Sequence, residues 1–175
     1  MIVVGETRDR ETARLSIEAA LAGRLVFTTL NANDAAGALI RAAELGADRF
    51  QVASAALGAM AQRLLRRLCP ECKEAYTPDD ISLEYVGLDP RHPVEFYRHR
   101  GCDKCSGTGY SGRVGVFEVL RMDAGLRRLV ARGASAEAVT ELAVKSGMRT
   151  MKNYAGWLLQ NGWTTMSEVL QVIAA

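Results

Sequence analysis

The sequence has neither a long apolar run nor an apolar leader. No run of about 18 apolar residues is present, so no segment is apolar for long enough to span a bilayer. Charged residues begin at Glu6, too early for the apolar part of a signal peptide. The 22 basic residues are balanced by 20 acidic ones, which excludes the strongly basic surface of a dedicated nucleic-acid binder. We therefore expect a cytoplasmic protein without a transmembrane segment or a nucleic-acid partner.

A phosphate-binding loop is also missing. The 175 residues contain no Gly-x-x-x-x-Gly-Lys-Ser/Thr pattern, which supplies the amides and the lysine that bind nucleotide phosphates. The glycines at 107, 109 and 112 follow a cysteine pair instead of a buried strand, so they indicate a turn. We expect that this chain alone neither binds nor hydrolyses ATP measurably.

Cysteine is scarce, but its four copies form two pairs, Cys69-Pro-Glu-Cys72 and Cys102-Asp-Lys-Cys105, with 29 residues between them. Two thiolates at this spacing can bind one metal ion from a tight turn, and two such turns complete a tetrahedron. Zinc with sulfur ligands at about 2.3 Å is the usual product. Four thiolates leave no open coordination position, so the predicted zinc is structural. Disulfides or ordinary buried thiols are the alternatives.

Two histidines and two tryptophans have simpler interpretations. His92 and His99 lie between the cysteine pairs, but four cysteines already complete the coordination sphere, so we expect solvent-exposed loop histidines. Trp157 and Trp163 occupy apolar positions in helical sequence, and we expect them in the core.

The first third of the chain predicts an α/β domain with a parallel sheet. Strands are predicted at 1–4 and 25–30. They alternate with a helix that Asp9 caps and Gly23 ends, and with another that Asn33 or Asp34 caps and Gly46 ends. The run at 1–4 has the character of an interior strand, with which a domain seldom begins.

The rest of the chain predicts mostly helices. Residues 50–61 indicate a buried helix, and a short helix is expected within 81–88. A strand is predicted at 113–120. Four helices follow, beginning near Asp123, Ser135, Met151 and the capping box at Thr165.

Polar residues follow both strands of the predicted parallel sheet. Glu6 follows the first, where a carboxylate can orient or deprotonate an attacking water in nucleotide-hydrolysing sheets. Asn31 follows the second and could contact a phosphate. The simpler interpretations are a helix-starting or surface role for Glu6, and helix capping for the polar residues near Asn31.

Five segments of the sequence resemble one known family. They are VVGETRDRETA at 3–13, AGRLVFTTLNANDA at 22–35, AQRL at 61–64, RRLCPEC at 66–72, and GCDKC with GTGYSGR within 101–113. Together they resemble the C-terminal half of the type II secretion and type IV pilus assembly ATPases. The resemblance covers nearly the whole chain, and the four cysteines make it specific.

The resemblance implies a RecA-like parallel-sheet half-domain with an inserted tetracysteine zinc element and a helical C-terminal subdomain. It divides the chain into the RecA-like part at 1–68, the zinc element at 69–112, and a strand with the helical subdomain at 113–175. It implies that Glu6 is the Walker B glutamate, that Asn31 lies in the nucleotide-sensing His box, and that the four cysteines bind zinc.

The resemblance also implies partners. The family forms homo-hexameric motors that couple hydrolysis of Mg-ATP to protein secretion or to assembly of a pilus-like fibre. Such a motor is cytoplasmic and, when assembled, peripheral at the inner membrane, where it meets a membrane platform and other cytoplasmic components. Mg-ATP is expected only in a full-length parent, because the phosphate loop lies upstream in the family.

This chain departs from the family pattern at three positions. Asn31 and Arg24 stand where histidines are expected, and Thr7 stands where isoleucine is usual. Asparagine can donate a hydrogen bond to a phosphate but carries no charge. An alternative function is therefore a zinc-stabilised docking module without catalysis. A chaperone-type zinc domain is a further alternative, but its CxxCxGxG motif occurs only once, at 102–109.

Overall fold

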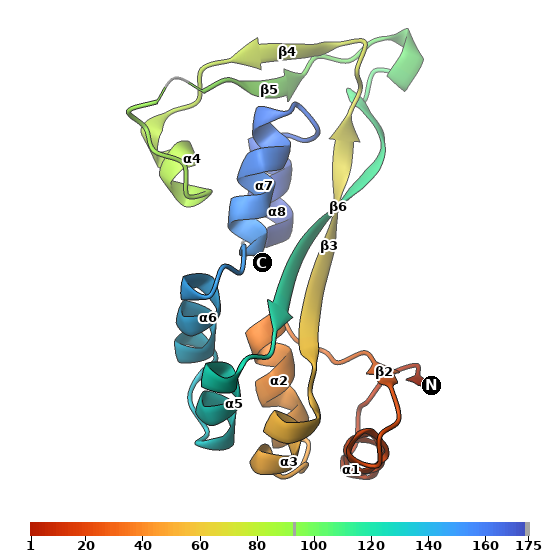
Figure 1. Ribbon diagram of the computed structural model, residues 1–175. Helices are drawn as coiled ribbons and strands as arrows, with labels where there is room; N and C mark the ends of the chain where they lie inside the picture. Colours follow the sequence, from red (N-terminus) through yellow and green to blue (C-terminus); the bar gives the residue numbers. More distant parts are fainter. Residues whose placement is uncertain (93, 174–175) are drawn as a thin grey trace. The chain divides into compact units, whose positions relative to one another are not determined.

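The computed structural model describes residues 1–92 and 94–173 (Figure 1). The described residues form two compact units. The first unit comprises Met1–Ala61 and Glu118–Met148, and the second comprises Gln62–Phe117 and residues 149–173. These units are defined by which residues pack together. The three-part division at 1–68, 69–112 and 113–175 is based on sequence motifs and stays a prediction.

The first unit begins with the predicted β-α-β order. β1 (Ile2–Val4) pairs in parallel with β2 (Val26–Thr28), and the residue pairs run from Ile2 opposite Val26 to Val4 opposite Thr28. α1 (Arg10–Leu21) connects the strands. Asp9 caps it as predicted, because its carboxylate accepts the N–H of Thr12 at 2.8 Å. Among the described residues, no third strand joins this pair.

Two helices follow, and the second is shorter than predicted. α2 (Ala35–Glu44) is capped by Asp34, whereas α3 (Arg49–Ala55) ends six residues before the predicted end at 61. The prediction of a buried helix over 50–61 is wrong for its second half, because β3 (Gly58–Leu68) begins there and pairs with β6 (Tyr110–Arg121). A side chain at Gly58 would meet the carbonyl oxygen of Leu120 at 2.5 Å, so this pairing needs glycine.

α5 (Ala124–Ala131) and α6 (Ala136–Lys145) complete the first unit. Both helices begin where predicted, and Asp123 and Ser135 cap them. The core of this unit consists of small and branched apolar side chains. They come from the helices and from the C-terminal end of β6. The core includes Ala35, Ala36, Leu39, Val52, Leu120, Leu126, Val130 and Val139.

The second unit contains all four cysteines. β4 (Lys73–Tyr76) and β5 (Phe96–His99) form an antiparallel pair, with α4 (Asp80–Tyr85) between them in sequence. α7 (Met151–Gln160) and α8 (Met166–Ile173) lie side by side below this pair in Figure 1. The core of the second unit includes Leu68, Leu83, Val86, Phe96, Leu158, Leu159 and Val169.

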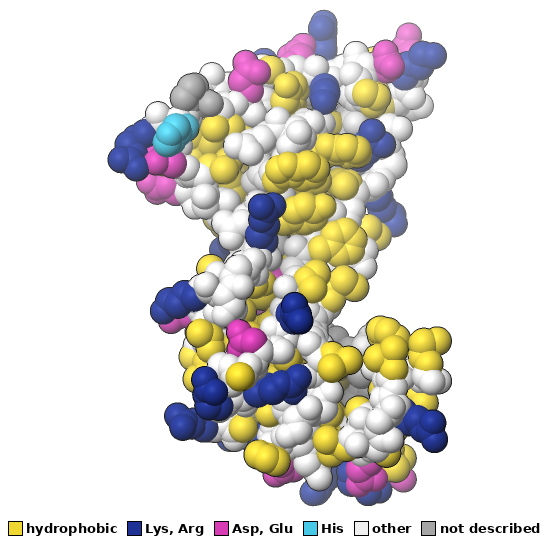
Figure 2. Space-filling view, in the orientation of Figure 1, with side chains coloured by type: hydrophobic (Ala, Val, Ile, Leu, Met, Phe, Trp, Pro, Cys, Tyr) yellow, Lys and Arg dark blue, Asp and Glu magenta, His cyan; other side chains and the backbone are white. Residues whose placement is uncertain are grey.

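Trp157 was predicted to lie in the core, but it does not. Its side chain is 44% exposed and stacks on the ring of Tyr154, with 5.8 Å between the ring centroids. Hydrophobic side chains gather over α7 on the face that Figure 2 shows. The prediction failed because the whole helix is rich in apolar residues, so the apolar pattern did not distinguish its buried face from its exposed one.

Within 1–92 and 94–173, no helix combines the length and the apolar character that crossing a membrane requires.

Candidate functional site

In the first unit, Glu6 lies two residues after the end of β1 and between two residues that bind Thr29. The hydroxyl of Thr29 donates to the carbonyl of Gly5 at 2.7 Å, and the N–H of Thr7 donates to the carbonyl of Thr29 at 2.9 Å. These bonds continue the β1–β2 pairing past its carboxyl end. The structure thus places Glu6 at the edge where parallel sheets bind ligands.

The carboxylate of Glu6 is paired with Arg8. Nη2 of Arg8 lies 2.6 Å from Oε2 of Glu6, and both side chains are exposed. The hydrogen bond from Arg8 lowers the pKa of Glu6, and the positive charge of Arg8 adds to this effect. Arg8 therefore favours the ionised form of Glu6 and orients its carboxylate.

Thr7, which the sequence marked only as a departure from a family pattern, has a defined role in this edge. Its side chain is buried, and its hydroxyl lies 2.7 Å from the hydroxyl of Thr28 at the end of β2. This bond adds a side-chain link to the backbone link between the segments that follow β1 and β2.

The structure brings Asn31 to the same edge as Glu6, but not Arg24. Asn31 follows β2, and its exposed side chain makes no hydrogen bond to any other described residue, which leaves its amide available to a ligand. Arg24 precedes β2, so it belongs to the opposite end of the parallel pair.

Glu118 is a candidate site residue that sequence reasoning missed. It lies in β6, its side chain is buried, and its Oε1 accepts the N–H of Ala35 at the start of α2 at 3.0 Å. A signal was present in the sequence. Alternation along the predicted strand places Glu118 on the same face as the apolar residues Val116 and Leu120.

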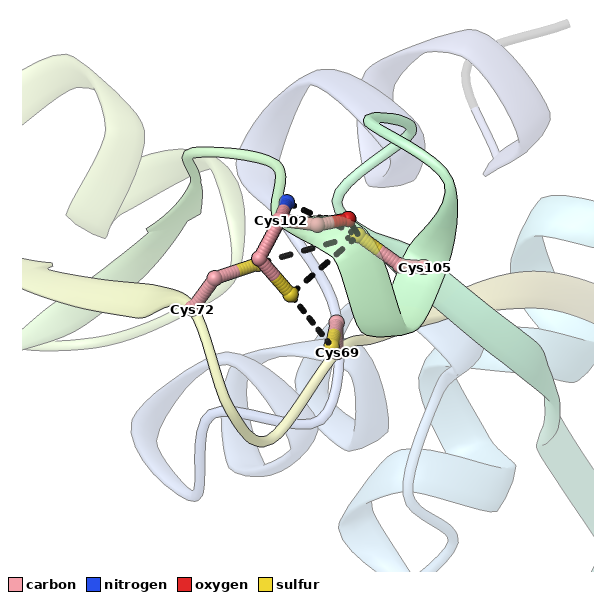
Figure 3. Close-up of side chains that lie close together, drawn as sticks. All are labelled: Cys69, Cys72, Cys102 and Cys105. Atoms are coloured by element: carbon pink, nitrogen blue, oxygen red, sulfur yellow. Dashed lines mark hydrogen bonds between the residues drawn. The ribbon is translucent and has the colours of Figure 1, made fainter.

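In the second unit, the two cysteine pairs converge into one cluster (Figure 3). The sulfur of Cys69 lies 3.9 Å from that of Cys102, and the sulfur of Cys72 lies 3.9 Å from that of Cys105. All four ligand atoms lie within 4.8 Å of one another. A tetrahedron with metal–sulfur bonds of about 2.3 Å has edges of about 3.8 Å, so the cluster fits a four-coordinate ion. The separations exceed a disulfide bond of about 2.05 Å.

The local backbone explains how the second cysteine pair, Cys102 and Cys105, closes. The N–H of Cys105 donates to the carbonyl of Cys102 at 3.2 Å, and the N–H of Gly107 donates to the same carbonyl at 2.9 Å. Ser106 follows in the left-handed conformation, at φ 52°. These turns direct the two thiols of the second pair to one side, toward the first pair.

Hydrogen bonds to sulfur prepare one thiol to act as a ligand. Burial opposes ionisation of Cys105, but the N–H groups of Cys102 and Gly109 and the neighbouring thiols outweigh it and lower its pKa to about 6. Burial, followed by hydrogen bonds with the other cysteines, raises the pKa of Cys72 to about 11. A bound cation would favour the thiolate at all four positions.

The two histidines lie outside this cluster. His92 is exposed near Asp89, and His99 is exposed at the end of β5, with its ring 5.1 Å from the ring of Tyr110. Neither belongs to the group of candidate ligands. Both are exposed as predicted, but the predicted loop position is wrong for His99, because it lies in β5.

The chain has clear relatives. A family model described as "Type II/IV secretion system protein" matches residues 1–171. The type IV pilus assembly ATPase PilB of Thermus thermophilus is 41% identical over 172 residues, covering 97% of this chain and 19% of the relative. The type II secretion system protein E of Pseudomonas aeruginosa is also 41% identical over 172 residues, covering 98% of this chain and 34% of the relative.

Solved structures share the fold. The pilus retraction motor PilT with bound ADP matches with a TM-score of 0.64 at 21% identity, covering 97% of this chain and 38% of that chain. The ATPase DotB of Legionella pneumophila matches with a TM-score of 0.64 at 18% identity, covering 95% of this chain and 37% of that chain. This chain thus spans between 19% and 38% of the length of these four proteins.

Proposed function

Because this chain belongs to the type II/IV secretion system protein family, we propose that it is part of a hexameric motor ATPase that powers type II protein secretion or type IV pilus assembly. The observation that supports this most is the edge of the β1–β2 pair. There Glu6, which the sequence resemblance assigns as the Walker B glutamate, lies beside the segment that carries Asn31. The relatives named above are described as a pilus assembly ATPase and a secretion system protein.

In this motor, Glu6 orients the attacking water and accepts its proton. Asn31 donates a hydrogen bond from its amide to the γ-phosphate, and because it is uncharged it stabilises the developing charge less than a protonated histidine would. The phosphate-binding loop is supplied by residues outside these 175. Mg-ATP therefore binds to the longer protein and not to this chain alone.

The cysteine cluster holds one structural zinc ion. Cys69, Cys72, Cys102 and Cys105 supply four thiolates, and four sulfur ligands leave no position for substrate. The bound ion would stabilise the turns that connect β3 to β4 and β5 to β6. Its contribution is thus to the shape of the second unit and not to hydrolysis.

The exposed faces of β1 and β2 are consistent with a larger sheet. Ile2, Val3 and Phe27 are all exposed in the described residues, and strands of parallel sheets are normally covered on both faces. In the longer protein, further RecA-like strands and helices cover these side chains. The assembled motor is cytoplasmic and peripheral at the inner membrane, where it contacts a membrane platform.

Calorimetric titration with Mg-ATP tests this function. We expect micromolar binding by the full-length protein and no heat above dilution for residues 1–175. Binding by residues 1–175 alone would show that the nucleotide site is built differently. A full-length protein that neither binds nor hydrolyses ATP would favour the alternative, a zinc-stabilised docking module.

A further inference from the structure

Glu118 occupies a core position that normally belongs to an apolar residue. Along β6, Val116 and Leu120 are fully buried, and Glu118 between them is only 4% exposed. A buried carboxylate destabilises a protein unless it is paired or hydrogen-bonded. Glu118 accepts the backbone N–H of Ala35 at 3.0 Å, across 83 residues of sequence.

The start of α2 needs this acceptor. The first N–H groups of a helix have no partner within it, and water cannot reach them here because Ala35 and Ala36 are fully buried. Asp34 accepts the N–H of Gly37 at 2.6 Å, and Glu118 accepts that of Ala35. A carboxylate at this end of a 10-residue helix also interacts favourably with the helix dipole.

The residues before α2 are tied at their other end to the strand that carries Glu6. Thr29 binds both Gly5 and Thr7, the two neighbours of Glu6. The short segment 30–34 therefore runs between two anchors, Thr29 at one end and Ala35 at the other. Asn31 lies in this segment, and its own side chain has no partner among the described residues to hold it.

We propose that Glu118 is a positioning residue for the nucleotide site: by holding Ala35 it fixes the end of segment 30–34, and thereby the place of Asn31 relative to Glu6. The placement of Asn31 is a property of this chain. Its consequence for hydrolysis rests on the proposed function.

Amide hydrogen exchange of residues 1–175, followed by NMR, tests the placement. Glu118→Ala removes the acceptor, so amides between 31 and 37 exchange about tenfold faster. Glu118→Gln keeps an oxygen acceptor without the charge, and the same amides exchange about threefold faster. This second variant decides the outcome if Glu118→Ala does not fold.

Asp123→Ala is the matched control, because Asp123 caps α5 in the same unit and accepts the N–H of Leu126 at 2.8 Å. It leaves exchange between 31 and 37 unchanged. Unchanged exchange between 31 and 37 in the Glu118 variants, or equal acceleration throughout the first unit, would overturn the placement.

ATP turnover by the full-length protein tests the consequence. Glu118→Ala lowers kcat by about tenfold to a hundredfold, the effect of a misplaced catalytic group. KM for ATP changes less than about threefold, because the phosphate loop lies elsewhere. Glu118→Gln recovers most of the turnover, and Asp123→Ala retains it.

Glu6→Gln, measured in parallel, separates the two hypotheses. If Glu6→Gln abolishes turnover while Glu118→Ala leaves kcat unchanged, the positioning role is wrong and the proposed function stands. If the wild-type protein has no turnover, the proposed function is wrong, and hydrogen exchange alone decides whether Glu118 places Asn31.

Discussion

The hydroxyls of Thr7 and Thr28 lie 2.7 Å apart, and they join the residue after Glu6 to the last residue of β2. Thr7 is buried, so its hydroxyl needs a partner, and among the described residues the hydroxyl of Thr28 is that partner. The buried hydroxyl of Thr7 is thus accommodated by a second threonine on the neighbouring strand.

A double-mutant cycle tests this pair. Thr7→Val keeps the shape and removes the hydroxyl, and we expect it to lower the free energy of unfolding by about 0.5–1 kcal/mol. Thr28→Val breaks the same bond, so the double variant should lose less than the sum of the single losses. Urea denaturation provides the measurement, and strictly additive losses would show that the hydroxyls do not interact.

The pKa of Glu6 depends on Arg8. Because the hydrogen bond from Arg8 lowers this pKa, Arg8→Ala should raise it toward the ordinary value for glutamate. A carboxyl group whose pKa is lower in the folded state stabilises the protein above its unfolded pKa, and loses that effect as the pH falls through the folded pKa. A carbon NMR titration of the Glu6 carboxyl measures the shift.

Arg14→Ala is the control for this titration, because it removes a comparable exposed arginine that pairs with Glu18 at 2.7 Å. The Glu6 titration should not respond to it. A Glu6 midpoint that is the same in wild type and Arg8→Ala would contradict the assigned cause.

Zinc content tests the cysteine cluster. The purified, untagged chain should contain one zinc ion, and Cys102→Ser should unfold the turns at 69–72 and 102–105 while helices α5 and α6 stay folded. Zinc should dissociate as the pH is lowered, because protons compete for the thiolates. Elemental analysis and circular dichroism provide the measurements. Substoichiometric zinc together with two disulfides by mass spectrometry would refute the site.

Arg66 and Glu168 form an ion pair that fixes α8 to the end of β3, close to Cys69. The side chain of Glu168 is buried, and its hydrogen bond raises the pKa of Arg66. Glu168→Gln should lower the free energy of unfolding by about 1–2 kcal/mol, because it weakens a hydrogen bond to a buried group.

The control for Glu168→Gln is Glu74→Gln, which disrupts the exposed pairs of Glu74 with Arg98 and Arg100. Exposed pairs contribute little, so this change should cost less than about 0.5 kcal/mol. Equal losses for the two variants, measured by urea denaturation, would mean that burial of Glu168 does not strengthen its pair.

Features that depend on neighbouring residues could be predicted from the sequence. Asp9 and Asp34 cap helices as expected, and helices begin after Asp123 and Ser135 as expected, because a helix start depends on interactions within about four residues. The convergence of the cysteine pairs followed from their spacing, because a metal ion requires its ligands to meet.

Features that depend on distant packing could not be predicted. The extent of β3 is set by its pairing with β6, so the apolar residues near 57–61 gave a false helix signal. The bond from Ala35 to Glu118 depends on how β6 packs against α2, and no local pattern contains it. Strand alternation indicates that Glu118 is buried, but only the packing of β6 against α2 shows that its partner is Ala35.

The most direct test of the proposed function is the ATP turnover of the full-length protein with Glu6→Gln, compared with wild type. The substitution keeps the size of the side chain and removes the base. We predict that ATP binding survives while turnover falls by about two or more orders of magnitude. Turnover within about twofold of wild type, accompanied by a small loss of thermal stability, would contradict a catalytic role and leave Glu6 as a residue that assists the start of α1.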